Sequence, residues 1–197
     1  MERTLPDYLG ARLPEVRAKH AALGLTDDES WTTIWSVFRA EDIRGEETFA
    51  DVPWLEVVFS GRLAELGRLQ FEDGGDGVLD VHIPETGPLT PVACDASFAR
   101  AREVFPDHHT AACRSWLLDP ALADVLPEDS NIVRFQRRFT LSDEGGDGNA
   151  DVLRFVFHTF DADLDKLEPK TTLERALVER IRAGGQWRSP RGVTSLA

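Results

Sequence analysis

Apolar residues recur every three or four positions in several stretches of the chain, which is the spacing of one buried face of an α-helix. The stretches with this pattern are residues 6–23, 26–38, 90–105 and 171–183. Capping-box patterns open two of them, with Thr26 before Glu29 and Thr171 before Glu174. The pattern therefore predicts four helices, of which the first two form an N-terminal helical pair.

From residue 54 onward, apolar and polar residues alternate in several short runs, as they do along β-strands. The runs predicted to be strands are residues 55–59, 63–72, 78–83, 111–118, 132–141 and 152–160. The first three follow one another closely and predict an antiparallel meander, and the last two predict a long hairpin. Residues 186–197 are expected to add an edge strand or a tail.

The central stretch, residues 78–105, runs from a strand through a loop into a helix. Thr90 is a suitable N-cap and Pro91 a suitable first helical residue. With the strand at 111–118 this stretch forms a βαβ unit, whose two strands should be parallel neighbours. The free N–H groups at such a helix start favour an anion such as phosphate, although a plain connection has the same local sequence.

The composition limits the classes of function. The chain has 197 residues, 42% hydrophobic and 29% charged, and its formal charge is -13. This acidity disfavours nucleic acid, and no run approaches the roughly 20 apolar residues of a membrane span. We expect a cytoplasmic protein with a helical segment at residues 1–50, an acidic connector at 40–51 and a main domain at 51–197. Cys94 and Cys113 are expected to be reduced core residues.

Five phrases resemble the C-terminal domain of GNAT-like proteins, the acyltransferase-domain proteins found in bacteria and often in actinobacteria. They are Gly67-Arg68-Leu69-Gln70-Phe71, His82-Ile83-Pro84-Glu85, Gly87-Pro88-Leu89-Thr90-Pro91, Ser115-Trp116-Leu117-Leu118-Asp119-Pro120, and Ser130-Asn131-Ile132 with Phe135-Gln136. The resemblance spans residues 54–187. It implies an α/β (α+β) fold of the GNAT N-acyltransferase type, with a mixed, mostly antiparallel, splayed central sheet flanked by helices.

The resemblance also implies a bound acyl-thioester, usually acyl-CoA as co-substrate, between the splayed strands 78–83 and 111–118. The pyrophosphate would lie on the N–H groups of Gly87, Leu89 and Thr90, and Ile83 would hold the thioester carbonyl. The loop here departs from the superfamily pattern Q/R-x-x-G-x-G/A. Its prolines lack N–H donors, and Glu85 adds a negative charge.

Acyl transfer to an amine needs a base for the proton of the nucleophile and a donor for the departing thiolate. His82 and Glu85, at the end of the central strand, are the candidate bases. The alternatives are a hydrogen-bonded sheet histidine for His82 and a helix-capping or solvated carboxylate for Glu85. Ser115 is a third catalytic candidate, unless its hydroxyl is satisfied locally. Tyr8, the chain's one tyrosine, lies outside the matching region, so the thiolate acid is not assigned.

The candidate substrate-binding residues are Trp116, Asn131, Arg134 and Gln136. On the predicted hairpin, Arg134 and Gln136 share a polar face that either meets solvent or lines an anionic substrate site. Asp119 before Pro120 is expected to cap a short helix. No metal site is expected, because adjacent histidines such as His108 and His109 rarely bind one ion. The tryptophans of residues 26–38 are expected to pack in the core.

The function predicted from these residues is acyl transfer from a thioester donor, acyl-CoA or a carrier protein, to an amine or hydroxyl of a small molecule or peptide. Two alternatives remain open at this point. One is a GNAT-like domain that binds a partner without catalysis, and the other is a hydrolase or cyclase that uses Glu85 and His82. A partner chain or a second copy is also expected to cover the sheet edge beside residues 55–59.

Overall fold

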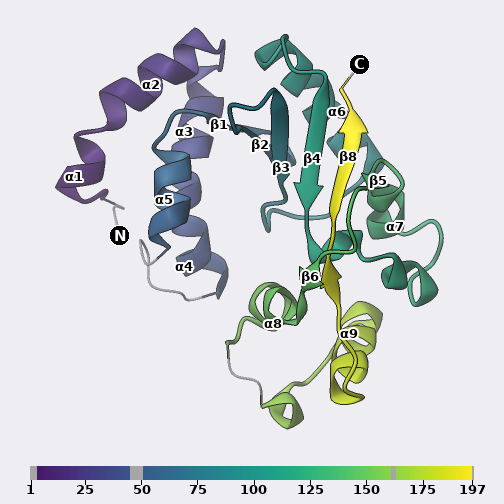
Figure 1. The fold of residues 1–197 in the computed structure, drawn as a ribbon. Coiled ribbons are helices and arrows are strands. Elements are labelled where there is room, and N and C mark those ends of the chain that lie inside the picture. The colour runs from purple at the N-terminus through teal and green to yellow at the C-terminus, as the bar shows by residue number, and fades with distance from the viewer. Residues whose placement is uncertain (1–3, 45–50, 161–162, 197) are drawn as a thin grey trace.

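The strands predicted around the central helix form the middle of a mixed sheet (Figure 1). The computed structural model describes residues 4–44, 51–160 and 163–196. Within these ranges the main sheet has six strands in the order β1-β2-β3-β4-β8-β5. Their bounds are β1 Leu63–Leu66, β2 Leu69–Asp73, β3 Val78–His82, β4 Thr110–Arg114, β5 Thr140–Leu141 and β8 Arg191–Ser195. A second, two-stranded sheet pairs β6, Gly146–Asp147, with β7, Arg188–Ser189.

The predicted βαβ unit is confirmed. The helix α6 spans Pro91–Val104, Thr90 accepts a hydrogen bond from Ala93 N at its start, and β3 and β4 pair in parallel. The other neighbouring pairs of the main sheet are antiparallel. The sheet is therefore mixed and mostly antiparallel, as expected.

The predicted strand at residues 63–72 is wrong, because the chain turns back on itself in its middle. Leu66 and Leu69 face each other across a two-residue loop in which Gly67 has a φ of 75°. Glycine adopts such an angle easily, and hairpins with glycine at the first loop position favour it. A Cβ at Gly67 would also lie 3.3 Å from Ser97 Oγ of α6. The turn joins β1 to β2 as an antiparallel hairpin.

One face of the sheet packs on α6, which Figure 1 shows behind the strands. The alternation of β2, β3 and β4 directs a set of fully buried side chains to this face. The set comprises Phe71, Leu79, Val81, Ala111 and Cys113, together with Cys94, Phe98 and Ala101 of α6. This apolar layer is the core that fixes the sheet on its central helix.

The N-terminal helices cover the other face at the β1 and β2 side of the sheet. They are α1 Asp7–Gly10, α2 Leu13–Ala22, α3 Asp27–Trp35, η1 Ser36–Phe38, α4 Arg39–Arg44 and α5 Val52–Val58. The predicted helical pair is thus a group of shorter helices, and the capping box at Thr26 is confirmed. Their apolar cluster includes Leu55, Val58 and Leu63, so it crosses residue 50. The second half of the predicted connector, residues 45–50, lies outside the described residues.

The predicted strand at residues 55–59 is wrong, since this segment belongs to the helix α5, Val52–Val58. Asp51 accepts a hydrogen bond from Trp54 N and Pro53 lies in the first turn, two features that start a helix. Leu55 and Val58, three positions apart, are then both buried in the N-terminal cluster. Packing against β1 therefore outweighs the strand preference of the valines in this segment.

The predicted hairpin at residues 132–160 is also wrong. Ser130 accepts a hydrogen bond from Val133 N and caps α7, Asn131–Gln136, and Asn149–Phe157 forms α8. The strand predicted at 111–118 ends at Arg114, where Ser115 caps η2, Trp116–Leu118. The remaining helices are η3 Pro120–Asp124, η4 Leu164–Lys166 and α9 Thr172–Arg182. Asp119 caps η3 and the capping box at Thr171 opens α9, as predicted.

The sheet edges differ from the expectation. β8 lies inside the sheet between β4 and β5, so the C-terminal segment is neither an edge strand nor a tail. At the opposite edge, all residues of β1 are buried and α3 packs against this strand. The open edge beside residues 55–59, on which the expected partner chain or second copy depended, is therefore absent from the described part of the fold. No helix in these ranges combines the length and the apolar character that crossing a bilayer requires.

Candidate active-site cleft

The parallel strands β3 and β4 separate at their C-terminal ends. Their pairing runs from Val78 opposite Thr110 to Asp80 opposite Ala112 and stops there. The next residues on each strand, 81–85 and 113–117, line the two sides of a cleft of about 830 Å³. The splay predicted for this sheet is thus present, and the cleft opens from it. Helices α5 and α8 supply further walls.

His82 projects from the end of β3 into this cleft. Its Nε2 lies 3.0 Å from Glu72 Oε2, on the adjacent strand β2. The ring also contacts Trp54 of α5 edge-on, at a centroid distance of 5.1 Å. A carboxylate beside Nε2 favours the tautomer with the proton on that nitrogen, so Nδ1 is the nitrogen that can accept a proton. His82 therefore has the carboxylate partner of a general base and lies in the wall of the cleft.

A buried polar network lies next to His82. Glu65 of β1, whose side chain is 3% exposed, accepts two hydrogen bonds of 2.9 Å from Arg39. Gln70 of β2 donates from Nε2 to Glu65 Oε2 at 2.8 Å, and the Glu65 backbone N–H donates to Thr33 Oγ1. A buried charge stays in place only when it is paired and hydrogen-bonded. These contacts hold both Arg39 and Gln70 at the wall of the cleft.

Arg68, in the hairpin loop between β1 and β2, holds the loop that follows β3. It donates to the backbone carbonyls of Pro84, Gly87 and Pro88 at 2.7, 3.0 and 3.3 Å. Burial lowers the pKa of this guanidinium from its ordinary value, although arginine remains charged at neutral pH. Arg68 thus fixes the loop and also brings a positive charge to the cleft wall.

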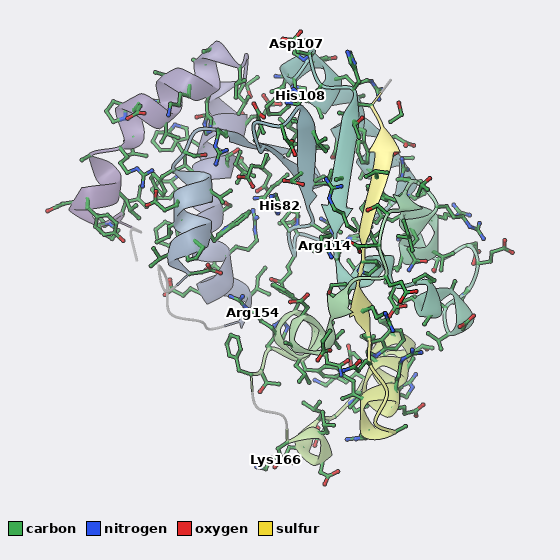
Figure 2. The ribbon with its side chains drawn as sticks, in the orientation of Figure 1. His82, Asp107, His108, Arg114, Arg154 and Lys166 are labelled. Atoms are coloured by element: carbon green, nitrogen blue, oxygen red, sulfur yellow. The ribbon has the colours of Figure 1, made fainter. Side chains whose placement is uncertain are left out.

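The cleft is rich in guanidinium groups although the chain as a whole is strongly acidic. Four arginines line it, against the three carboxylates of Asp51, Glu85 and Asp151. These arginines are Arg39, Arg68, Arg114 and Arg154. Three of them belong to ion pairs, Arg39 with Glu65, Arg114 with Asp143 and Arg154 with Asp51. Figure 2 shows Arg114 and Arg154 on the same side of the sheet as His82. Guanidinium groups of this kind bind carboxylate and phosphate groups.

The outer wall of the cleft is aromatic. Phe155 of α8 is 37% exposed, and Phe160 just after that helix is 75% exposed. Arg154 lies over both rings, at 5.3 and 5.5 Å from their centroids. Exposed apolar side chains gathered at the mouth of a cleft indicate an apolar part in the ligand.

Five of the residues predicted for the site meet in this cleft. They are His82, Ile83, Glu85, Ser115 and Trp116. Glu85 is half-buried at the start of the loop after β3. The Ser115 hydroxyl accepts a hydrogen bond from Leu117 N and caps η2, which is the local role considered for it. Its O–H hydrogen can still be donated toward the cleft.

The other predicted residues lie outside the cleft walls. Gly87 is exposed on the loop, Leu89 is buried in the core against α6, and the Thr90 hydroxyl caps that helix. Asn131 and Arg134 lie on α7, and the Gln136 side chain donates to the carbonyls of Leu117 and Asp119. The structure thus separates the predicted phosphate loop and the α7 residues from His82.

Several cleft residues were missed because they come from elements that the sequence placed wrongly. Trp54 and Arg154 belong to helices that were expected to be strands. Gln70 and Glu72 alternate with Leu69 and Phe71 in the sequence. That alternation was a usable signal, because it puts both polar side chains on the face opposite the core.

The described residues hold no cluster of three or more histidine, cysteine or acidic side chains placed for a metal ion. His108 lies 3.3 Å from Asp73, at the end of the sheet opposite to the splay (Figure 2). Cys113 is an unsuitable nucleophile, because its burial raises the pKa of its thiol to about 12. The groups that line the cleft and can act in catalysis include the His82 imidazole, the Glu85 carboxylate, the Ser115 hydroxyl and the arginine cations.

Comparison with known proteins gives one family and several structures. GNAT-like C-terminal domains match residues 63–194. An acyltransferase solved in complex with decanoyl-CoA and teicoplanin is 35% identical to this chain, with a TM-score of 0.83. The match covers 96% of this chain and 65% of the acyltransferase chain. An acyltransferase in complex with decanoyl-CoA is 36% identical, with a TM-score of 0.83 over 96% and 64%. The chain thus spans 65% or less of the length of these two structures. No curated protein matches it.

Proposed function

We propose, from the premise that this chain belongs to the family of GNAT-like C-terminal domains, that it transfers an acyl group from an acyl-CoA donor to an amine or hydroxyl acceptor. The observation that carries the proposal is the cleft between the splayed ends of β3 and β4, with His82 in its wall and Glu72 hydrogen-bonded behind it. Similar acyltransferases have been solved with decanoyl-CoA bound. We extend that donor class to this chain.

The donor fits the cleft in its charge and in its apolar wall. Arginines at the wall would balance donor phosphates, and Arg68 is hydrogen-bonded to the loop after β3. The exposed rings of Phe155 and Phe160 would cover an aliphatic acyl chain. We therefore propose a donor with an acyl chain of medium length, such as decanoyl.

In the proposed reaction the acceptor's nitrogen or oxygen attacks the thioester carbonyl carbon, and the carbon–sulfur bond breaks. His82 Nδ1 takes the proton of the nucleophile, while Glu72 stabilises the resulting imidazolium through Nε2. The same proton then passes to the departing thiolate, so the histidine returns to its neutral form. A backbone N–H near Ile83, where β3 leaves its parallel neighbour, would stabilise the oxyanion.

The acceptor is proposed to be a small molecule or a peptide. One of the similar acyltransferases was solved with teicoplanin bound, and a second with 10C-teicoplanin. A bulky acceptor with aromatic groups would suit the mouth of this cleft, where Trp54 and Phe155 are among the lining residues.

Isothermal titration with coenzyme A and decanoyl-CoA tests the donor. We expect micromolar binding, tighter for decanoyl-CoA because its acyl chain buries apolar surface. The variant Glu85→Gln should bind the donor more tightly if this carboxylate faces the phosphates, whereas the exposed control Glu128→Gln should not change. Failure of the purified chain to bind either compound would reject the acyl-CoA donor.

A further inference from the structure

Resting on the proposed function, we propose that Gln70 is the specificity-determining residue that selects an amine acceptor over a hydroxyl. Gln70 lies on β2 directly opposite His82 of β3, so both side chains project from the same face of the sheet. Both residues line the cleft, and Gln70 is only 2% exposed. A buried amide at the wall of a cleft is expected to hydrogen-bond either the protein or a ligand.

The Glu65 and Arg39 pair decides which end of this amide faces the cleft. Arg39 donates to both oxygens of Glu65, and the oxygens of a carboxylate only accept hydrogen bonds. The NH₂ group of Gln70 must therefore point to Glu65, and its Oε1 must point away. Among the described residues, no hydrogen bond reaches Gln70 Oε1. A fixed acceptor atom is thus available at the wall of the cleft.

A nucleophile needs two hydrogens to bond both acceptor atoms on these neighbouring strands, His82 Nδ1 and Gln70 Oε1. His82 Nδ1 removes one hydrogen during the attack, and Gln70 Oε1 would bind a second. A neutral primary amine has two hydrogens and satisfies both atoms, whereas a hydroxyl has one and leaves Gln70 Oε1 unpaired. An unpaired buried acceptor costs about 1–3 kcal/mol, which corresponds to about 5- to 150-fold in rate. The cleft should therefore prefer amines by roughly this factor.

The test compares two acceptors of the same shape, benzylamine and benzyl alcohol, with decanoyl-CoA as the donor and thiol release as the signal. The wild-type chain should have a higher kcat/KM for benzylamine. The variant Gln70→Met, which keeps the length of the side chain, should lower kcat/KM for benzylamine by about 10-fold or more. Transfer to benzyl alcohol should not fall and should rise, because the variant no longer leaves a buried acceptor unpaired.

Two further variants separate this role from a general loss of structure. Glu65→Gln frees the amide of Gln70 to rotate, so it should reduce the amine preference in the same direction, though less. Gln186→Met makes the same chemical change at an exposed position and should leave both rates unchanged. An equal fall of both rates in Gln70→Met, or an unchanged benzylamine rate, would overturn the role of Gln70.

Donor titration keeps the two proposals distinguishable. Gln70→Met should bind decanoyl-CoA with the wild-type Kd, because the amide is assigned to the acceptor. A wild-type chain that binds decanoyl-CoA but acylates neither acceptor faster than solution would overturn the role of Gln70 and leave the donor proposal intact. A wild-type chain that does not bind decanoyl-CoA would overturn both.

Discussion

The two faces of the strands β2, β3 and β4 carry opposite kinds of residue. The face toward α6 is formed by side chains that are at most 3% exposed, namely Phe71, Leu79, Val81, Ala111 and Cys113. The other face carries polar side chains, namely Gln70, Glu72, Asp80, His82 and Arg114. Neighbours along each strand thus belong to different environments, one packed on α6 and one that faces the N-terminal helices and most of the cleft.

This difference indicates that residues that stabilise the fold alternate along the same strands with residues available for binding and catalysis. Burial of apolar area on the α6 face supplies most of the free energy that holds the sheet. The polar face adds little to it, because its charges are paired or partly hydrated. Changes on the first face should alter the free energy of unfolding, whereas changes on the second should alter binding and catalysis.

The largest expected effect is that of Phe71→Ala on the α6 face. The Phe71 side chain is 0% exposed and packs edge-on against Phe98 at 5.5 Å. Its removal leaves a cavity, so the free energy of unfolding should fall by about 4 kcal/mol, measured by urea denaturation. The control Phe160→Ala removes a ring that is 75% exposed and should cost less than about 1 kcal/mol. Equal losses would contradict the division between the faces.

The variant His82→Gln, on the cleft face, should lower the catalytic rate and leave the free energy of unfolding almost unchanged. We expect kcat to fall about 100-fold or more, because the variant side chain cannot accept a proton at neutral pH. The free energy of unfolding should change by less than about 1 kcal/mol, since the His82 side chain is 34% exposed. The exposed residue His109 provides a control as His109→Gln. A variant that keeps its rate but unfolds easily would assign His82 to structure.

A smaller effect on the free energy of unfolding is expected at an ion pair between α3 and α6, the helices that pack on the two faces of the sheet. Glu29 of α3 receives hydrogen bonds of 2.8 and 2.9 Å from Arg100 of α6. This arginine lowers the pKa of Glu29 from 4.5 to about 2. The variant Glu29→Gln should therefore lose about 1 kcal/mol of unfolding free energy at pH 7.

The pH dependence of that loss has a definite sign. A carboxylate whose pKa is lower in the folded state than in the unfolded state stabilises the fold at pH values above its unfolded pKa. This stabilisation disappears as the pH falls through the pKa of the folded state. The difference between wild type and Glu29→Gln should hence be full above about pH 5 and shrink as the pH falls from 4.5 toward 2. Asp124→Asn, at an exposed position, should show no such trend. A constant difference over this range would reject the ion pair as its source.

The central unit could be predicted from sequence because its signals are local. Thr90 and Pro91 mark the helix start, and the stripe of Cys94 and Phe98 gives its buried face. The helices α5 and α8 could not be predicted, because their segments are rich in valine and aromatic residues. The start of α5 depends on its Asp51 cap, and both helices depend on partners distant in the chain.

The site was predictable only where it follows from the strand end. His82, Ile83 and Glu85 lie at the end of β3, and all three line the cleft. Arg39 and Arg154 reach the cleft from α4 and α8, and no spacing in the sequence relates them to His82. Contacts of this kind depend on tertiary packing.

Amide hydrogen exchange with and without saturating decanoyl-CoA tests the central claim most directly. The account predicts that protection increases in residues 81–85 and 113–117, on the two sides of the splay, while the buried middle of α6 does not change. Protection confined to the surface groove of Trp31 and Trp35, or no protection with the ligand bound, would contradict the assignment of this cleft to the donor.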